Sequence, residues 1–152
     1  MASPLKDTHS GAEAPCPPRS DSRRAFRVLV VDDHLLVRRT TRWQLQEIHR
    51  LHVVGEAADG LEAVALARTL MPDLIIMDIC MPVLDGIEAT RRIKAAFPDI
   101  LILIQSSHDE KSVFQSALEA GANGYVRKGS PSEQFTNAVL SLLPSPGRRR
   151  TK

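Results

Sequence analysis

Cysteine is scarce in this chain, whose 152 residues include only Cys16 and Cys80. Neither belongs to a CxxC pair or has zinc-site spacing, so the sequence supports no disulfide framework and no thiolate metal site. Charge of one sign is scarce too, because the formal net charge is only +2. So small a charge creates no global field that would attract nucleic acid or an anionic membrane.

Long apolar runs and the common catalytic motifs are missing as well. No run approaches the roughly 18 residues of a membrane helix, and the N-terminus lacks the basic-then-apolar pattern of a signal peptide. We therefore expect a cytoplasmic protein that does not bind membranes. The sequence has no GxGxxG motif, P-loop or Ser/His/Asp arrangement to suggest other chemistry.

Composition divides the chain into three parts. Residues 1–25 contain several prolines and serines without apolar periodicity, and we expect a disordered leader there. Residues 26–143 carry periodic apolar segments and form the expected folded domain. Residues 144–152 are expected to be a basic flexible tail, solvated rather than bound to nucleic acid.

Apolar strands alternate with helices along the folded part. An unbroken apolar run bounded by turn residues is typical of a strand buried on both faces. The predicted strands cover residues 26–31, 53–57, 74–77, 100–104 and 124–127. The predicted helices cover about residues 34–48, 60–71 and 85–97, then one around 113–118 and one ending near 142.

Two helices have more detailed signatures. The side chains expected on the buried face of the fourth helix are Val113, Phe114, Ala117 and Leu118, with Gly121 as its left-handed cap. The fifth helix is expected to begin with a capping box of Ser130 and Glu133, with Pro131 at the first helical position.

The alternation predicts an α/β fold of repeated βα units around a parallel sheet. Right-handed crossovers favour a doubly wound, flavodoxin-like, five-stranded sheet of order 2-1-3-4-5 with helices on both faces. Ligands bind such sheets at the switch point, here between the first and third strands. Asp32 and Asp33 follow the first strand and Asp78 follows the third, so three carboxylates are expected in one crevice.

Three carboxylates at one strand edge repel one another unless protons or a cation hold them. Oxygen ligands without His or Cys suit Mg²⁺. Ser106 after the fourth strand adds a hydroxyl, and Lys128 after the fifth adds an ammonium. Together these groups predict a phosphoryl site in which cations neutralise the oxygens and a carboxylate attacks phosphorus.

Residues 27–143 resemble the receiver domain of two-component response regulators. The residues that carry the resemblance are Val30-Val31-Asp32-Asp33-His34, Met77-Asp78-Ile79-Cys80-Met81-Pro82-Val83-Leu84-Asp85-Gly86, Ser106 and Lys128. Their order, spacing and placement at successive strand ends make the joint pattern specific. The resemblance implies that a sensor histidine kinase or phosphotransfer protein supplies the phosphoryl group that Asp78 accepts.

The resemblance also implies roles for the neighbouring residues. Mg²⁺ would be bound directly by Asp33 and through water by Asp32, beside Asp78 and the backbone carbonyl of Cys80. Lys128 would pair with the phosphoryl group. Ser106 would swing toward that group and Tyr125 would rotate inward. These movements would shift the equilibrium between two conformations of the face formed by the fourth helix, fifth strand and fifth helix.

Several of these residues have a plainer interpretation. Asp32 and Asp33 could simply cap the first helix, and Tyr125 could simply pack in the core. Ser107 competes with Ser106 for the hydroxyl role. His34 and His108 are expected to be exposed cap and loop residues, Asp85-Gly86 a structural turn and cap, and Trp43 partly buried packing.

Three functions are weighed. The first is a phosphoacceptor switch, not an enzyme, that signals through protein contacts. The second is a pseudo-receiver that binds partners without phosphorylation, which the intact set of site residues argues against. The third is a phosphatase or phosphotransferase on a free substrate. That function would need a second carboxylate where the chain has Cys80, or a cap over the site, for which the sequence has no insertion of sufficient size.

The sequence around Asp32 and Tyr125 most resembles receivers of LuxR-type transcription regulators. Those regulators carry a DNA-binding helix-turn-helix, for which no pattern follows residue 143. We therefore expect no direct DNA binding by this chain, which is either a stand-alone receiver or the receiver portion of a longer regulator. A homodimer is one further possibility, and the sequence leaves open whether it would use the first and fifth helices or the Tyr125 face.

Overall fold

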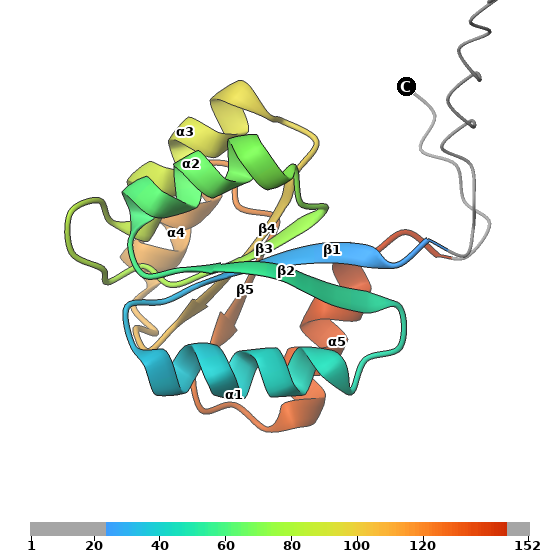
Figure 1. Ribbon diagram of the computed structural model, residues 1–152. Coiled ribbons are helices and arrows are strands. Elements are labelled where there is room, and N and C mark those ends of the chain that lie inside the picture. Colours follow the sequence, from blue (N-terminus) through green and yellow to red (C-terminus); the bar gives the residue numbers. More distant parts are fainter. Residues whose placement is uncertain (1–23, 146–152) are drawn as a thin grey trace, which may run out of the picture.

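The structure, a computed structural model, describes residues 24–145, so the expected leader and basic tail lie almost wholly outside the described residues. One parallel sheet has the order β2-β1-β3-β4-β5 (Figure 1). The strands are β1 (Phe26–Val31), β2 (Leu51–Ala57), β3 (Leu74–Met77), β4 (Leu101–Ser106) and β5 (Gly124–Arg127). The helices are α1 (Leu35–Gln46), α2 (Gly60–Leu70), α3 (Gly86–Ala96), α4 (Lys111–Glu119) and α5 (Ser132–Leu142). The predicted order and alternation are confirmed.

Helices cover both faces of the sheet. Figure 1 shows α2, α3 and α4 on one side and α1 and α5 on the other. In β3, Ile75 and Met77 join the core on the first side, whereas Leu74 and Ile76 join the core on the second. Burial on both faces explains why this strand is continuously apolar rather than alternating. Within residues 24–145, none of the helices has the length and apolar character needed to cross a bilayer.

The loop between Asp78 and α3 is tightly packed. The Asp85 carboxylate accepts a hydrogen bond from the Glu88 backbone N–H (2.9 Å), which confirms its expected role as a helix cap. The Gly86 N–H donates to the Ile79 carbonyl (2.9 Å). A Cβ at Gly86 would lie 1.8 Å from the Asp78 carbonyl oxygen, so the loop can close this tightly only over glycine.

The predicted capping box at the start of α5 is wrong. The N-cap is Pro131, whose extended backbone (φ −51°, ψ 144°) starts the helix one residue later than expected, and no side chain caps it. The Pro131 carbonyl accepts the first-turn hydrogen bonds from Gln134 (2.9 Å) and Phe135 (3.3 Å). Ser130 and Glu133 are therefore out of register for the reciprocal pair that a capping box requires.

Three side chains are more exposed than expected. Phe114 and Leu118 are each 41% exposed, because α4 turns only the flank that carries Ala117 firmly onto the sheet. Trp43 is 64% exposed on α1, where Thr41 and Leu45 occupy the buried face. Helical spacing in the sequence identified the apolar residues but overestimated the width of the buried faces. Gly121 has the expected left-handed backbone (φ 105°) after α4.

Substitution of Gly86 by alanine should destabilise the fold, because its new Cβ meets backbone that has no room to move. We expect Gly86→Ala to lower the free energy of unfolding by about 3 kcal/mol. Gly129→Ala is the control, since Gly129 has a left-handed backbone (φ 75°), which Gly86 lacks, but nothing within 4 Å of an added Cβ. The control should lose only about 1 kcal/mol, the cost of the left-handed conformation. Urea unfolding measures both, and equal losses would contradict the prediction.

Candidate functional site

Three aspartates meet at the carboxyl edge of the sheet, as predicted. Val31 of β1 pairs with Met77 of β3, so Asp32 and Asp78 follow directly opposed residues. Asp32 is 3% exposed and Asp78 is 4% exposed. Burying two carboxylates side by side is costly unless a cation compensates them.

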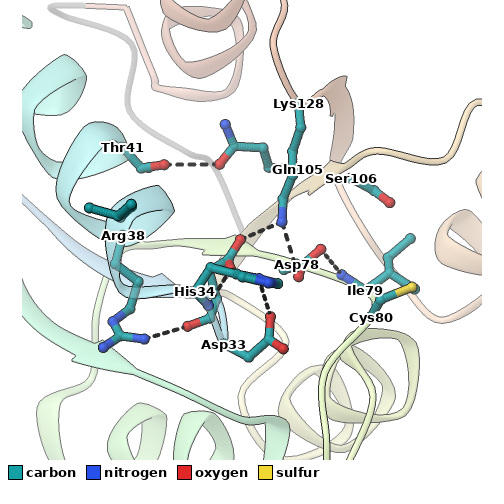
Figure 2. Close-up of polar contacts among 12 residues, drawn as sticks. Asp33, His34, Arg38, Thr41, Asp78, Ile79, Cys80, Gln105, Ser106 and Lys128 are labelled. Carbon is teal, nitrogen blue, oxygen red and sulfur yellow. Dashed lines mark hydrogen bonds and ion pairs between the residues drawn. The ribbon is translucent and has the colours of Figure 1, made fainter.

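Lys128 supplies that compensation. Its ammonium lies 2.5 Å from Oδ2 of Asp32 and 3.1 Å from Oδ2 of Asp78. Figure 2 shows the Lys128 side chain reaching from the end of β5 to Asp78. The Lys128 backbone N–H donates to the Ser106 carbonyl (2.8 Å), which fixes where the side chain begins. Lys128 is therefore no solvated surface lysine, and its side chain is only 17% exposed.

The Asp78 carboxylate and the Lys128 ammonium shift each other's pKa. Burial raises the pKa of Asp78, the Lys128 ammonium opposes this, and the Asp32 carboxylate adds to it, so that the pKa of Asp78 lies above its ordinary value. Burial lowers the pKa of Lys128, but the carboxylates of Asp32 and Asp78 outweigh it and leave this pKa above its ordinary value. Lys128 therefore stays a cation at neutral pH.

Asp33 lies at the rim of the same site. Its buried Oδ1 has no hydrogen-bond donor in residues 24–145 and is approached only by the His34 ring, at 2.9 Å. Oδ1 of Asp32 accepts the His34 backbone N–H (2.8 Å), and His34 itself is the N-cap of α1. The plain capping interpretation therefore accounts for one oxygen of Asp32 and for none of Asp33.

The donor set suits a hard divalent cation. Asp32, Asp33 and Asp78 offer carboxylate oxygens, and two of these are buried without a hydrogen bond: Oδ2 of Asp32, which pairs with the Lys128 ammonium, and Oδ1 of Asp33, which does not. The Cys80 carbonyl follows in the loop after Asp78 and accepts no hydrogen bond from the described part of the chain. All-oxygen sets with few carboxylates are those in which Mg²⁺ binds. The residues present therefore fit the expected ion.

Ser106 is fully buried at this edge of the sheet, at the end of β4, unlike its competitor Ser107, which is exposed. The Ser106 hydroxyl oxygen accepts a hydrogen bond from the His108 backbone N–H (3.2 Å). The hydroxyl thus has a fixed local contact and makes none with Asp78.

Tyr125 is held by the same loop. Its hydroxyl donates to the His108 carbonyl, and its ring packs edge-on against Phe114, with centroids 5.5 Å apart. The structure therefore places Tyr125 beside the loop after Ser106 and does not bring it to the carboxylates. Both a packing role and a switching role are compatible with one position of the ring.

Sequence reasoning missed several contacts around the site. Arg38 on α1 donates to the Asp32 carbonyl (2.8 Å), and the Thr41 hydroxyl donates to Oε1 of Gln105 (3.1 Å) (Figure 2). The thiol of Cys80 lies 3.1 Å from Nε2 of His108 and so links the loops after β3 and β4. The sequence held only a weak sign of these contacts: Thr41 is a polar residue on the otherwise apolar face of the first helix.

Comparison with known proteins agrees with this geometry. A family model described as the response regulator receiver domain matches residues 28–140. The response regulator UvrY of Escherichia coli K12 is 40% identical over 115 residues, which cover 76% of this chain and 53% of that protein. The response regulator GacA of Pseudomonas aeruginosa is 41% identical over 118 residues, covering 78% and 55%. The chain thus spans about half the length of these curated relatives.

Solved structures give the same result. A LuxR-family response regulator from Aurantimonas has a TM-score of 0.74 at 38% identity, over 77% of this chain and 84% of that one. The receiver domain of the putative response regulator NarL from Mycobacterium tuberculosis has a TM-score of 0.74 at 34% identity, over 78% and 95%. The fold and the family therefore agree.

The raised pKa of Asp78 predicts a pH-dependent stability. As pH rises from the ordinary aspartate pKa to the raised one, the unfolded chain loses its proton first, so stability falls and the penalty is complete above that window. Asp78→Asn should therefore be more stable than wild type at pH 7.5, and the gain should vanish near pH 3.5. Urea unfolding at both pH values, with the exposed Asp99→Asn as control, measures this. A variant less stable than wild type at pH 7.5 would contradict it.

Proposed function

This chain belongs to the response regulator receiver domain family, and from this membership we propose that Asp78 is its phosphoacceptor. Accepting a phosphoryl group is the standard function of such domains. The observation that supports Asp78 is its position: a buried carboxylate at the carboxyl end of β3, 3.1 Å from a lysine and next to two further aspartates. Receiver domains are signalling switches, and we propose that this one turns over no external substrate.

The chemistry follows from the residues in place. A carboxylate oxygen of Asp78 attacks phosphorus and forms an acyl phosphate, while the bond from phosphorus to the donor's imidazole nitrogen breaks and the electron pair leaves with that nitrogen. Oδ1 of Asp78 is already fixed by the Ile79 N–H (2.8 Å), and Oδ2 faces Lys128. Lys128 then exchanges a carboxylate for a phosphoryl oxygen, so its charge stays paired throughout.

We propose that Asp33 holds Mg²⁺ directly, with Asp32, Asp78 and the Cys80 carbonyl around it. Receiver domains as a family bind Mg²⁺ at the phosphorylation site, where the ion adds positive charge against the phosphoryl oxygens. The unsatisfied Oδ1 of Asp33 supports this assignment. Because Lys128 already contacts Asp32 and Asp78, Asp33 is the carboxylate most available to a metal.

The switch proposed for this domain runs through Ser106 and Tyr125. The Ser106 hydroxyl would leave the His108 N–H and donate to the phosphoryl group, which alters the loop whose His108 carbonyl holds Tyr125. Because the backbone of His108 contacts both Ser106 and Tyr125, a movement of Ser106 would change the surroundings of Tyr125. The result is a shift in the equilibrium between two conformations of the face formed by α4, β5 and α5.

We propose a sensor histidine kinase or phosphotransfer protein as the donor and a protein surface as the output. The relatives are about twice as long as the stretch matched here, so the receiver portion of a longer transcription regulator is the alternative setting. Direct DNA binding is not proposed for this chain. A homodimer through α1 and α5 or through the Tyr125 face remains part of the proposal.

A pseudo-receiver that works without phosphorylation is the second candidate. The paired geometry of Asp78, Lys128 and Asp32 argues against it, because an unused site has no need to bury two carboxylates on one ammonium. A phosphatase on a free substrate is the third, and the thiol of Cys80 stands where its acid or base would be required. The phosphoacceptor switch therefore explains more of the observed site than either alternative.

Intact mass after incubation with acetyl phosphate tests the proposal. We expect wild type to gain one phosphoryl group only when Mg²⁺ is present, and Asp78→Asn to gain none, because its amide is no nucleophile. The Asp85→Asn variant changes the nearby helix cap alone and should still be modified. If the wild-type protein binds Mg²⁺ but gains no mass, the proposal is wrong and the pseudo-receiver is the better explanation.

The choice between Ser106 and Ser107 predicts a second result. Ser106→Ala removes a hydroxyl that would donate to the phosphoryl group, and we expect it to slow phosphorylation by acetyl phosphate about tenfold, the worth of one charge-assisted hydrogen bond. Ser107→Ala removes an exposed hydroxyl and should leave the rate unchanged. A slower Ser107→Ala with a normal Ser106→Ala would reverse the assignment.

A further inference from the structure

Arg38 contacts the turn that carries the acidic pair. Its Nη1 donates to the Asp32 carbonyl (2.8 Å), and its Nε donates to the Glu56 carboxylate (3.3 Å). The side chain is only 16% exposed, and Glu56 is 26% exposed. Figure 2 shows Arg38 reaching from α1 toward the turn with Asp33. Arg38 thus ties the start of α1, the end of β1 and the neighbouring strand β2 together.

The contacted carbonyl belongs to the peptide unit between Asp32 and Asp33. On its other side, the Asp32 N–H donates to the Ala57 carbonyl of β2 (3.1 Å). Asp32 also has its side chain held, by the His34 N–H and by Lys128. Asp33 has weaker support: its buried Oδ1 accepts no hydrogen bond in residues 24–145, and the His34 ring that approaches it, at 2.9 Å, is 70% exposed. The orientation of the Asp33 carboxylate therefore depends mainly on its backbone, which Arg38 contacts at the Asp32 carbonyl.

We propose that Arg38 is a positioning residue of the metal site, one that sets the direction of Asp33 through the Asp32 carbonyl. This inference rests on the proposed function, in which Asp33 holds Mg²⁺. Groups that orient metal ligands without touching the ion change metal affinity by about 10–100-fold when removed. The guanidinium suits this role because its planar fork serves the carbonyl and Glu56 at once, whereas an ammonium is a single point donor.

The sign of the effect separates positioning from plain electrostatics. Removing a positive charge beside three carboxylates should by itself strengthen the binding of a cation. Positioning requires the opposite, because an unfixed Asp33 must be ordered each time the ion binds. Weaker Mg²⁺ binding after loss of Arg38 thus has no explanation in charge alone.

Arg42 offers a matched control on the same helix. It pairs with the same Glu56 carboxylate (3.1 Å) but makes no contact with Asp32. Arg38→Gln and Arg42→Gln therefore remove the same charge and the same partner, and differ in the carbonyl contact. Arg38→Lys keeps the charge and should recover part of the lost affinity.

The experiment is Mg²⁺ titration by calorimetry of the four proteins, with urea unfolding to establish that each is folded. We expect the dissociation constant to rise about tenfold in Arg38→Gln, to rise less in Arg38→Lys, and to stay unchanged or fall in Arg42→Gln. In the acetyl phosphate reaction, Arg38→Gln should need about tenfold more Mg²⁺ for half-maximal rate and reach a similar plateau.

Each other result overturns the proposal in a distinct way. If Arg38→Gln binds Mg²⁺ as tightly as wild type, Arg38 does not position Asp33. If Arg42→Gln weakens binding equally, the effect belongs to the Glu56 pairing. If Arg38→Gln does not fold, Arg38→Lys decides, and wild-type affinity in that variant rejects the bidentate role. If wild type binds no Mg²⁺, the metal assignment itself falls and this inference falls with it.

Discussion

The ammonium of Lys128 lies between the carboxylates of Asp32 and Asp78, and the rest of the carboxyl edge depends on this contact. Each carboxylate is nearly inaccessible to water, so burying the pair without a cation would be costly. The contact spans the sheet from the end of β5 to the ends of β3 and β1. It exists only because the strand order places those three ends along one edge.

The surrounding structure keeps this edge rigid in three different ways. The loop after Asp78 closes over Gly86, where even a methyl group would collide with backbone. The end of β4 carries Ser106, whose hydroxyl is held by the loop that also holds Tyr125. The start of α1 is held by Arg38 at the Asp32 carbonyl. Chemical groups from distant parts of the sequence are thereby fixed with little freedom, as a site for a charged ligand requires.

The same contacts explain how a small chemical change can spread. In the proposed switch, a phosphoryl group on Asp78 would give Lys128 and Ser106 a new partner of higher charge, and each of these residues is already linked to a second element. Lys128 is bound through its backbone to Ser106, and His108 joins Ser106, Tyr125 and Cys80. A packed interior moves between discrete arrangements rather than deforming gradually. The site and the proposed output face are therefore one connected network.

Sequence patterns alone predicted the sheet order, the carboxyl ends of β1, β2, β3 and β5, and the placement of Asp32, Asp33, Asp78 and Lys128 at that edge, whereas β4 continues two residues past its predicted end, through Ser106. These predictions were possible because continuous apolar runs and the residues that follow them are local signals, and crossover handedness leaves few ways to join them. The three-dimensional packing was needed to show that Phe114, Leu118 and Trp43 are partly exposed, that Pro131 is the N-cap of α5, and that Arg38 contacts the Asp32 carbonyl. Exposure and long-range contacts depend on which segments lie beside a side chain in the folded protein. The spacing of apolar residues along the sequence does not reveal this, because it reports only on local structure.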